Sequence, residues 1–131
     1  HWRKMALWEQ ATRVPLLLKV PGRTEPGSEF LQPVSLLDLA PTVMDIANLE
    51  APAQFQGQSL LEITEEAARR RPAHMFWDDA SSVRVGKWRW TLYADGGQEL
   101  YDLSTDPEEY ENLLVRDGAL EGGIEALLAK T

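Results

Sequence analysis

Short turn signals within residues 73–102 constrain the fold of this chain more than any other feature. The segments HMFWD, SSVRV, WRWTLYA and QELYDL read as short strands, and the turns Gly86-Lys87 and Asp95-Gly96-Gly97 separate the last three. Glycine-containing turns of this length join neighbouring antiparallel strands. The sequence therefore predicts an antiparallel meander of three or four strands.

One face of the predicted sheet is aromatic. Trp88, Trp90 and Leu92 alternate along one strand, so their side chains share a face. Such a face could stack a sugar or a base, but a core or interface role suits the pattern better. His74, in an earlier predicted strand, is interpreted as structural.

Two helices are predicted after the sheet. Thr105 or Asp106 would cap the first, with Pro107 at its first position and Glu109 completing a capping box. A second helix, residues 124–130, is expected to pack on one face of the sheet.

The first half of the chain does not form a self-contained sheet. RVPLLLKV, residues 13–20, reads as one buried strand with Pro15 at its start or at an edge. Helical patterns occupy MALWEQAT, VSLLDLAPTVMDIANL and SLLEITEEAARR. In the second of these, Asp38 is the predicted N-cap, which puts Pro41 in the first turn, where proline is tolerated. The first half therefore resembles the tail of a larger α/β domain.

Charge and composition exclude several functions. The chain has 131 residues and a net charge of −8, from 13 Lys and Arg against 21 Asp and Glu. An acidic chain lacks the basic footprint of a nucleic-acid binder and is not attracted to an anionic membrane. It contains no Cys, which excludes disulfides and Cys-ligated zinc, and no apolar run approaches the ~20 residues of a membrane span. We expect a soluble protein without nucleic-acid or membrane partners, whose compartment stays open.

Few residues stand out as candidates for chemistry. Asp78-Asp79 could bind a metal, but a solvated turn is the better interpretation, and Asp102 and Asp106 suit turn and cap roles. No nucleophile–base pair, metal-ligand spacing or phosphate loop is present. Lys4, flanked by aromatic residues, could present a compact cation to an anion or could simply be solvated.

The opening residues resemble a family motif. The pattern K-x-x-L-W-E-x-x-T-R-V-P-L from Lys4 to Leu16 resembles a late segment of the catalytic domain of the sulfatases. Further sulfatase-like elements follow in the family's order, each weak alone and together specific. They are DLAPTVMDIAN from Asp38, QGQSLL from Gln56, VRVGKWRWTLY from Val83 and ELYDLSTDPEEYENL from Glu99.

The resemblance implies a fold and a domain division. It points to the alkaline-phosphatase-like superfamily, an α/β class in which a large α/β domain precedes a smaller C-terminal domain. In that smaller domain a four-stranded antiparallel sheet packs against a helix. Residues 1–70 would be the end of the catalytic α/β domain, and residues 71–131 the C-terminal sheet-plus-helix subdomain.

The resemblance also implies a chemistry that this chain would share with a longer parent. Sulfatases hydrolyse sulfate esters with a formylglycine and a divalent metal, commonly calcium. The formylglycine motif is absent here and the family's metal ligands lie upstream, so no metal ligand is assigned. The partners would be a sulfate-ester substrate and the remainder of the catalytic domain, and the chain alone would be inactive. By motif position Lys4 would contact the sulfate, His1 and Trp2 would line the substrate pocket, and Glu9 and Arg13 would serve in an ion pair or a cap.

Two alternatives stay open. The parent could be a phosphodiesterase or phosphonate monoester hydrolase of the same superfamily. The chain could instead be a non-catalytic module whose Trp-bearing sheet binds carbohydrate or protein.

Overall fold

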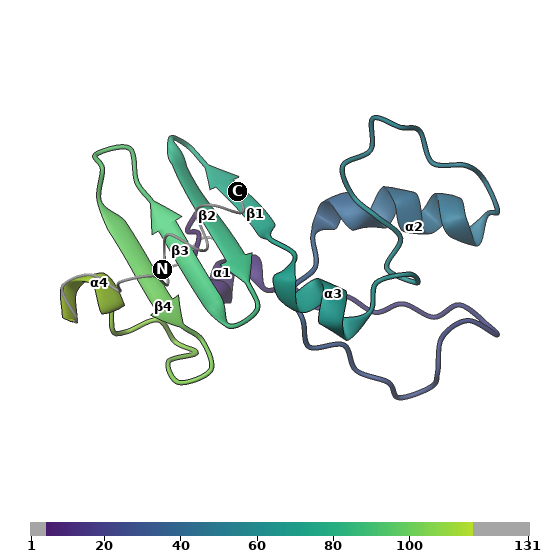
Figure 1. Cartoon of the computed structure of the whole chain (residues 1–131), viewed down its shortest axis with the longest axis horizontal. Coiled ribbons are helices and arrows are strands. Elements are labelled where there is room, and N and C mark those ends of the chain that lie inside the picture. The colour runs from purple at the N-terminus through teal and green to yellow at the C-terminus, as the bar shows by residue number, and fades with distance from the viewer. Residues whose placement is uncertain (1–4, 117–131) are drawn as a thin grey trace. The chain divides into compact units, whose positions relative to one another are not determined.

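A computed structural model describes residues 5–116, which divide into two compact units (Figure 1). The first unit comprises residues 5–14 together with residues 72–116, and the second comprises residues 15–71. The start of the chain therefore belongs to the same unit as the predicted sheet, although more than fifty residues separate the two segments.

The first unit is built on one antiparallel sheet of four strands in the order β1-β2-β3-β4. This confirms the predicted meander and the fold class, an α/β fragment with a four-stranded antiparallel sheet. Gly96 adopts a φ of 84° in the β3–β4 turn, a conformation that glycine reaches without a steric penalty. The strands are β1 (Ala73–Trp77), β2 (Ala80–Val85), β3 (Trp88–Leu92) and β4 (Gln98–Asp102).

The fully buried face of β3 is the polar one. Arg89 and Thr91 are 1% and 0% exposed, whereas Trp88, Trp90 and Leu92 are half-buried. Thr91 Oγ1 donates to Ser82 Oγ on β2 at 2.9 Å, which satisfies a hydroxyl that would otherwise be costly to bury. Alternation was predicted correctly, and the core or interface role of the half-buried aromatic face stays a prediction.

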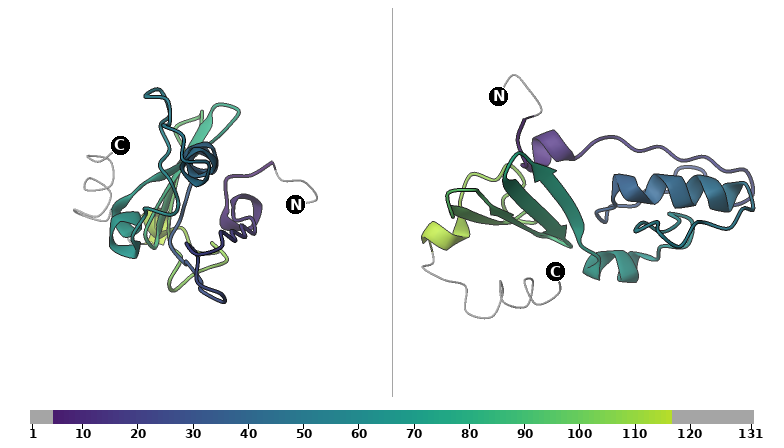
Figure 2. Two further views of the ribbon diagram at one scale, coloured as in Figure 1. Left: turned by 90° about the vertical axis from the view of Figure 1, so that its right-hand side faces the viewer. Right: turned by 90° about the horizontal axis from the view of Figure 1, so that it is seen from above.

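The buried face of the sheet is covered by a short helix from the start of the chain. Helix α1 (Glu9–Thr12) lies beside the sheet, and Arg89 donates to the carbonyl of Leu7 just before it (Figure 2). A helix of one turn is not stable alone in water, so tertiary contacts must hold it.

The prediction of a helix that begins near Pro107 is wrong, because residues 107–111 are not helical. Asp106 lies in the turn after β4 and its carboxylate accepts from the amides of Tyr110 and Glu111 at 3.1 and 2.9 Å, so it does not cap a helix there. Glu109 has a φ of 59°, which breaks the helical path and turns its side chain inward. Helix α4 (Leu113–Arg116) begins only after Asn112, and the helix predicted at residues 124–130 lies outside the described residues.

The second unit contains a 3₁₀ turn, η1 (Leu36–Asp38), and the helices α2 (Leu39–Ile46) and α3 (Glu65–Arg70). The helical segment begins earlier than predicted because Ser35 is its N-cap. The Ser35 hydroxyl accepts from the Leu37 amide at 3.2 Å, and the Asp38 carboxylate accepts from the Ser35 amide at 2.9 Å. Pro41 lies in the first turn of α2 as predicted.

Asp38 organises this second unit. Its fully buried carboxylate pairs with Arg71 at 2.7 Å and accepts from the amide of Gln58 at 3.0 Å. Thr42 donates to the Asp38 carbonyl at 2.6 Å and accepts from the Leu60 amide at 2.8 Å. The motif residues of this helix therefore tie α2 to the 57–61 loop and have a structural role.

The strand predicted at residues 13–20 is not formed among the described residues. Leu17 is 92% exposed and Leu16 44%, and no described strand pairs with this extended segment. A strand requires a neighbour for its backbone hydrogen bonds, so local composition alone cannot create one. Among residues 5–116 no helix combines the length and the apolarity needed to cross a membrane.

Candidate functional site

The three residues predicted to contact substrate, His1, Trp2 and Lys4, lie outside the described residues. The structure does describe the motif residues that follow them. These are held on the sheet by four charged side chains, here named the Arg89 cluster: Glu9, Arg84, Arg89 and Glu109.

The centre of the cluster is a buried ion pair. Arg89 Nε lies 2.8 Å from Glu109 Oε1, and both side chains are 1% exposed. These two atoms are paired by charge and distance rather than by a well-aligned hydrogen bond. Arg89 Nη2 also donates to Glu9 Oε2 at 2.5 Å and to Thr12 Oγ1 at 3.0 Å. One guanidinium group thus engages both α1 and the loop that follows β4.

The cluster also binds the backbone of the α1 segment at two points. Arg89 Nη1 donates to the carbonyl of Leu7. Glu109 Oε2 accepts from the amide of Glu9 at 2.5 Å, across a sequence separation of 100 residues. That amide is in the first turn of α1, where helix N–H groups lack intrahelical partners. Glu109 therefore supplies a cap that no residue near α1 provides.

Burial dominates the electrostatics of the cluster. It raises the pKa of Glu109, and the Glu9 amide and the positive charge of Arg89 offset only part of that rise. Burial likewise lowers the pKa of Arg84, which lies 3.7 Å from Glu9. The Nη1 atom of Arg84 is buried without a hydrogen-bond partner among the described residues.

A second set of contacts holds Trp8. Its indole N–H donates to Glu99 Oε2 at 3.0 Å, and the hydroxyl of Tyr93 donates to the same oxygen at 2.8 Å. Burial, together with the Glu99 carboxylate, raises the pKa of Tyr93 to about 12, so the hydroxyl stays a donor at neutral pH. The W-E pair of the motif is therefore anchored at both residues.

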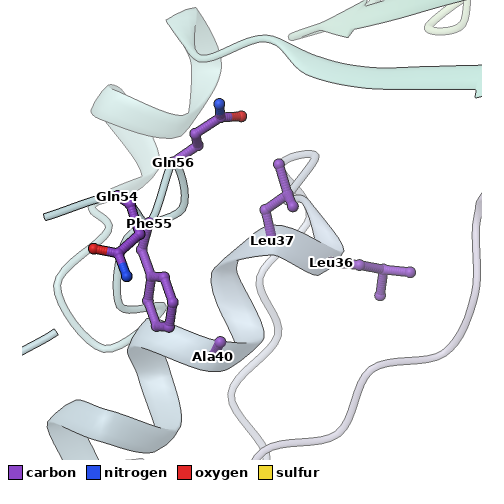
Figure 3. A pocket seen from close by; sticks show the side chains of 6 residues that line it. All are labelled: Leu36, Leu37, Ala40, Gln54, Phe55 and Gln56. Carbon is purple, nitrogen blue, oxygen red and sulfur yellow. The ribbon is translucent and has the colours of Figure 1, made fainter. Parts of the chain in front are cut away.

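The described part of the chain has a hollow in each unit. A cleft of about 260 Å³ beside the Arg89 cluster is lined by Glu9, Gln10, Arg13, Arg84, Leu103, Pro107 and Glu108. A hollow of about 320 Å³ in the second unit is mainly apolar and is lined by Leu36, Leu37, Ala40, Gln54, Phe55 and Gln56 (Figure 3). Neither set contains a nucleophile beside a base.

The other candidate residues lie in turns or on a strand of the sheet. Asp78 and Asp79 are exposed in the β1–β2 turn, as predicted, and Asp78 has a φ of 52°. Asp102 pairs with Lys87 at 2.5 Å and accepts from the Ser104 amide at 3.0 Å, which confirms its turn role. His74 is exposed and stacks on Phe76, with ring centroids 6.3 Å apart.

The ion pair or cap predicted for Glu9 is confirmed, but its partners were not predicted. Arg89 lies between two tryptophans in the sequence, and the prediction for Glu109 was a capping box. The sequence does place a charged residue, Arg89, on the face of the strand opposite the tryptophans. If that face is buried, the charge requires a partner.

Comparison with known proteins identifies the chain. Residues 1–127 match the family described as N-sulphoglucosamine sulphohydrolase, C-terminal. Arylsulfatase K of Mus musculus is 34% identical over 128 residues, covering 84% of this chain and 23% of that protein. A sulfatase of Formosa agariphila is 30% identical over 112 residues, covering 83% and 22%.

Solved structures agree with these relatives. The structure of a 2-O GAG sulfatase superposes with a TM-score of 0.51 at 27% identity, covering 70% of this chain and 23% of that one. The chain spans about a quarter of the length of the curated relatives that it matches. Because the family match covers nearly the whole sequence, the chain belongs to the family of N-sulphoglucosamine sulphohydrolase C-terminal regions, the C-terminal region of a sulfatase.

Proposed function

We propose that the full-length protein containing this chain hydrolyses a sulfate ester to an alcohol and inorganic sulfate. The match of residues 1–127 to a sulphohydrolase C-terminal region carries this proposal. Relatives named arylsulfatase K and sulfatase add support. A sulfated sugar is the substrate class to test first, because one similar structure is that of a 2-O GAG sulfatase.

Within that reaction Lys4 contacts the sulfate group, and His1 and Trp2 line the substrate pocket. An ammonium group at this point would stabilise the negative charge that develops on the leaving oxygen and the sulfuryl oxygens. The sulfatase-like pattern from Lys4 to Glu9 supports this assignment. Contacts that hold Leu7 and Glu9 on the sheet support it as well, since a substrate-contacting loop needs a fixed base.

The nucleophile and the metal come from other parts of the full-length protein. Sulfatases use a formylglycine, which supplies the nucleophile, and a divalent cation, commonly calcium. Among residues 5–116 no group of three His, Cys, Asp or Glu side chains could hold a metal ion, and the chain contains no Cys. The described residues therefore do not fit such a site.

The remainder of the catalytic domain is the partner of this chain. Residues 1–70 close that domain and residues 71–131 form the C-terminal subdomain, with α1 packed onto the sheet of the latter. The exposed apolar segment around Leu17 supports this arrangement, because it offers unpaired backbone to a neighbouring strand. Without that remainder the chain is inactive.

The test compares Lys4→Ala with Lys19→Ala in the full-length protein. Sulfate release from an aryl sulfate and from glucosamine sulfates would be measured by ion chromatography. Loss of one charge-stabilising group is expected to lower kcat by about 10² to 10³-fold. Lys19, exposed in the 13–20 segment, serves as the matched control and should leave kcat unchanged.

Other results would redirect the assignment. Faster turnover of the phosphate ester of the same alcohol would favour the phosphodiesterase or phosphonate monoester hydrolase alternative. Metal-dependent turnover by the chain of residues 1–131 alone would contradict its proposed inactivity. Absence of turnover by the full-length protein on every ester would favour the non-catalytic module.

A further inference from the structure

We infer that Arg89 and Glu109 are positioning residues, which fix the segment carrying Lys4 in the orientation that sulfate contact requires. The inference rests on the proposed role of Lys4. It assigns the sheet of the C-terminal subdomain a part in the reaction, although its residues do not touch the substrate.

Two backbone bonds carry the inference. Arg89 Nη1 binds the carbonyl of Leu7 and Glu109 Oε2 binds the amide of Glu9, which are three and five residues after Lys4. An extended chain covers at most about 3.6 Å per residue, so three residues place Lys4 within about 11 Å of Leu7. Fixing these two groups therefore sets the position and direction of the backbone at residues 7–9, which begins three residues after Lys4.

Bonds to side chains complete the attachment. Arg89 Nη2 engages Glu9 Oε2 at 2.5 Å and Thr12 Oγ1 at 3.0 Å, so both ends of α1 are bound to the same guanidinium group. Trp8 is held separately by Glu99. The α1 segment thus has one orientation on the sheet, specified by directional polar contacts rather than by apolar packing alone.

The chemistry of the pair argues for positioning over bulk stability. Burying two opposite charges carries a desolvation penalty that their mutual attraction only roughly offsets. An apolar pair of similar volume would therefore stabilise the sheet to a similar extent. An apolar pair could not bind the Leu7 carbonyl or the Glu9 amide. What the charged pair adds is directional bonding, and errors of about 1 Å in the placement of a reacting group cost about 10²-fold in rate.

A double-mutant cycle in the full-length protein tests the inference. Arg89→Lys keeps the charge but loses the forked geometry that reaches several acceptors at once. We expect it to lower kcat by about 10-fold or more when Lys4 is present, and by less than about 3-fold in a Lys4→Ala background. KM should change less than kcat if the loss is confined to transition-state contacts.

Arg71→Lys is the matched control. Arg71 forms a buried pair with Asp38 in the second unit, so the same chemical change is made away from the Arg89 cluster. Its effect on kcat should be the same with and without Lys4. Glu109→Gln removes the charge that pairs with Arg89 but keeps an oxygen for the Glu9 amide. It provides a second variant if Arg89→Lys does not fold, and a smaller loss with the same dependence on Lys4 is expected of it.

The outcomes separate the inference from the proposed function. Additive effects of Arg89→Lys and Lys4→Ala, matched by additive effects of Glu109→Gln, would overturn the positioning role while leaving the role of Lys4 intact. Unchanged kcat in Lys4→Ala would overturn the assignment of Lys4 itself. A full-length protein that releases no sulfate would overturn the proposed function.

Discussion

At the scale of single residues, the fully buried charged side chains among residues 5–116 pair with partners from distant parts of the sequence. Arg89 joins Glu109 and Glu9, and Asp38 joins Arg71 across 33 residues. Leaving either member of such a pair alone would strand a charge in an apolar environment, which is far more costly than the pair is stabilising. Each unit therefore depends on a buried ionic contact.

The pKa of Asp38 predicts how stability changes with pH. Burial alone would raise it, but hydrogen bonds from Arg71 and from the amides of Ser35 and Gln58 outweigh burial and leave the pKa below its usual 3.8. A carboxylate with a lowered folded-state pKa contributes stability above the unfolded-state value, and that contribution is lost as pH falls through the folded-state value. We expect Asp38→Asn to be less stable than the wild type at pH 7, with the difference shrinking below about pH 4.

Urea denaturation of the full-length protein at pH 7 and at pH 3 measures this difference. Arg71→Met is the companion variant, since it removes the partner that lowers the pKa and should abolish the same pH dependence. An Asp38→Asn deficit of equal size at both pH values would contradict the assignment.

At the scale of elements, the short helices α1 and α4 are completed by contacts with residues far away in the sequence. Helix α1 has four residues and takes its cap from Glu109, while α4 begins where Asn112 accepts from the Leu100 amide at 3.1 Å and donates to the Gln98 carbonyl at 2.9 Å. Such elements lack the length to form alone, so their ends are determined by tertiary contacts.

Gly57 illustrates a close approach between two elements. A Cβ at this position would lie 2.1 Å from the carbonyl oxygen of Leu37, a backbone atom that cannot rotate away. We expect Gly57→Ala to destabilise the second unit by about 2 kcal/mol through overpacking. Thermal unfolding should report the loss as a lowered Tm.

Gly97→Ala is the control for this prediction. Its Cβ would meet the side chain of Asp95 at 3.0 Å, and a side chain can move. The cost should stay below about 1 kcal/mol, in the range of ordinary surface substitutions. Equal losses in the two variants would show that the Leu37 contact is not the cause.

At the scale of the whole molecule, the described residues include an extended segment with exposed apolar side chains. Leu16, Leu17 and Leu18 are 44%, 92% and 39% exposed on one extended segment without a strand neighbour. Unpaired apolar strands promote self-association. We expect residues 1–131 expressed alone to elute above the 14.8 kDa of a monomer, and Leu17→Lys to shift the mass toward that value.

Light scattering after size-exclusion chromatography provides the measurement. Leu31→Lys, at a leucine that is 75% exposed outside this segment, is the matched control and should leave the elution unchanged. A monomeric chain, or equal effects of both substitutions, would contradict the role assigned to residues 13–20.

The sequence by itself determined the strands of the sheet, the positions of α2 and α3, and the family. Turn glycines and strand composition predicted the meander from residue 73 to 102, and the helical pattern of SLLEITEEAARR contains α3. The predicted N-cap was Asp38, and Ser35 was missed, although its capping box with Asp38 needs only neighbouring residues.

The tertiary structure alone decided which face of the sheet is buried and what holds the start of the chain. An alternating pattern marks two faces but does not say which one α1 will cover, and Glu109 reaches Glu9 across 100 residues. The same limit explains the missing strand at 13–20, since pairing depends on a neighbour that composition cannot supply. Either face of β3 could be buried as far as the local sequence is concerned. Long-range contacts determine that the buried side chain is Arg89 rather than a tryptophan.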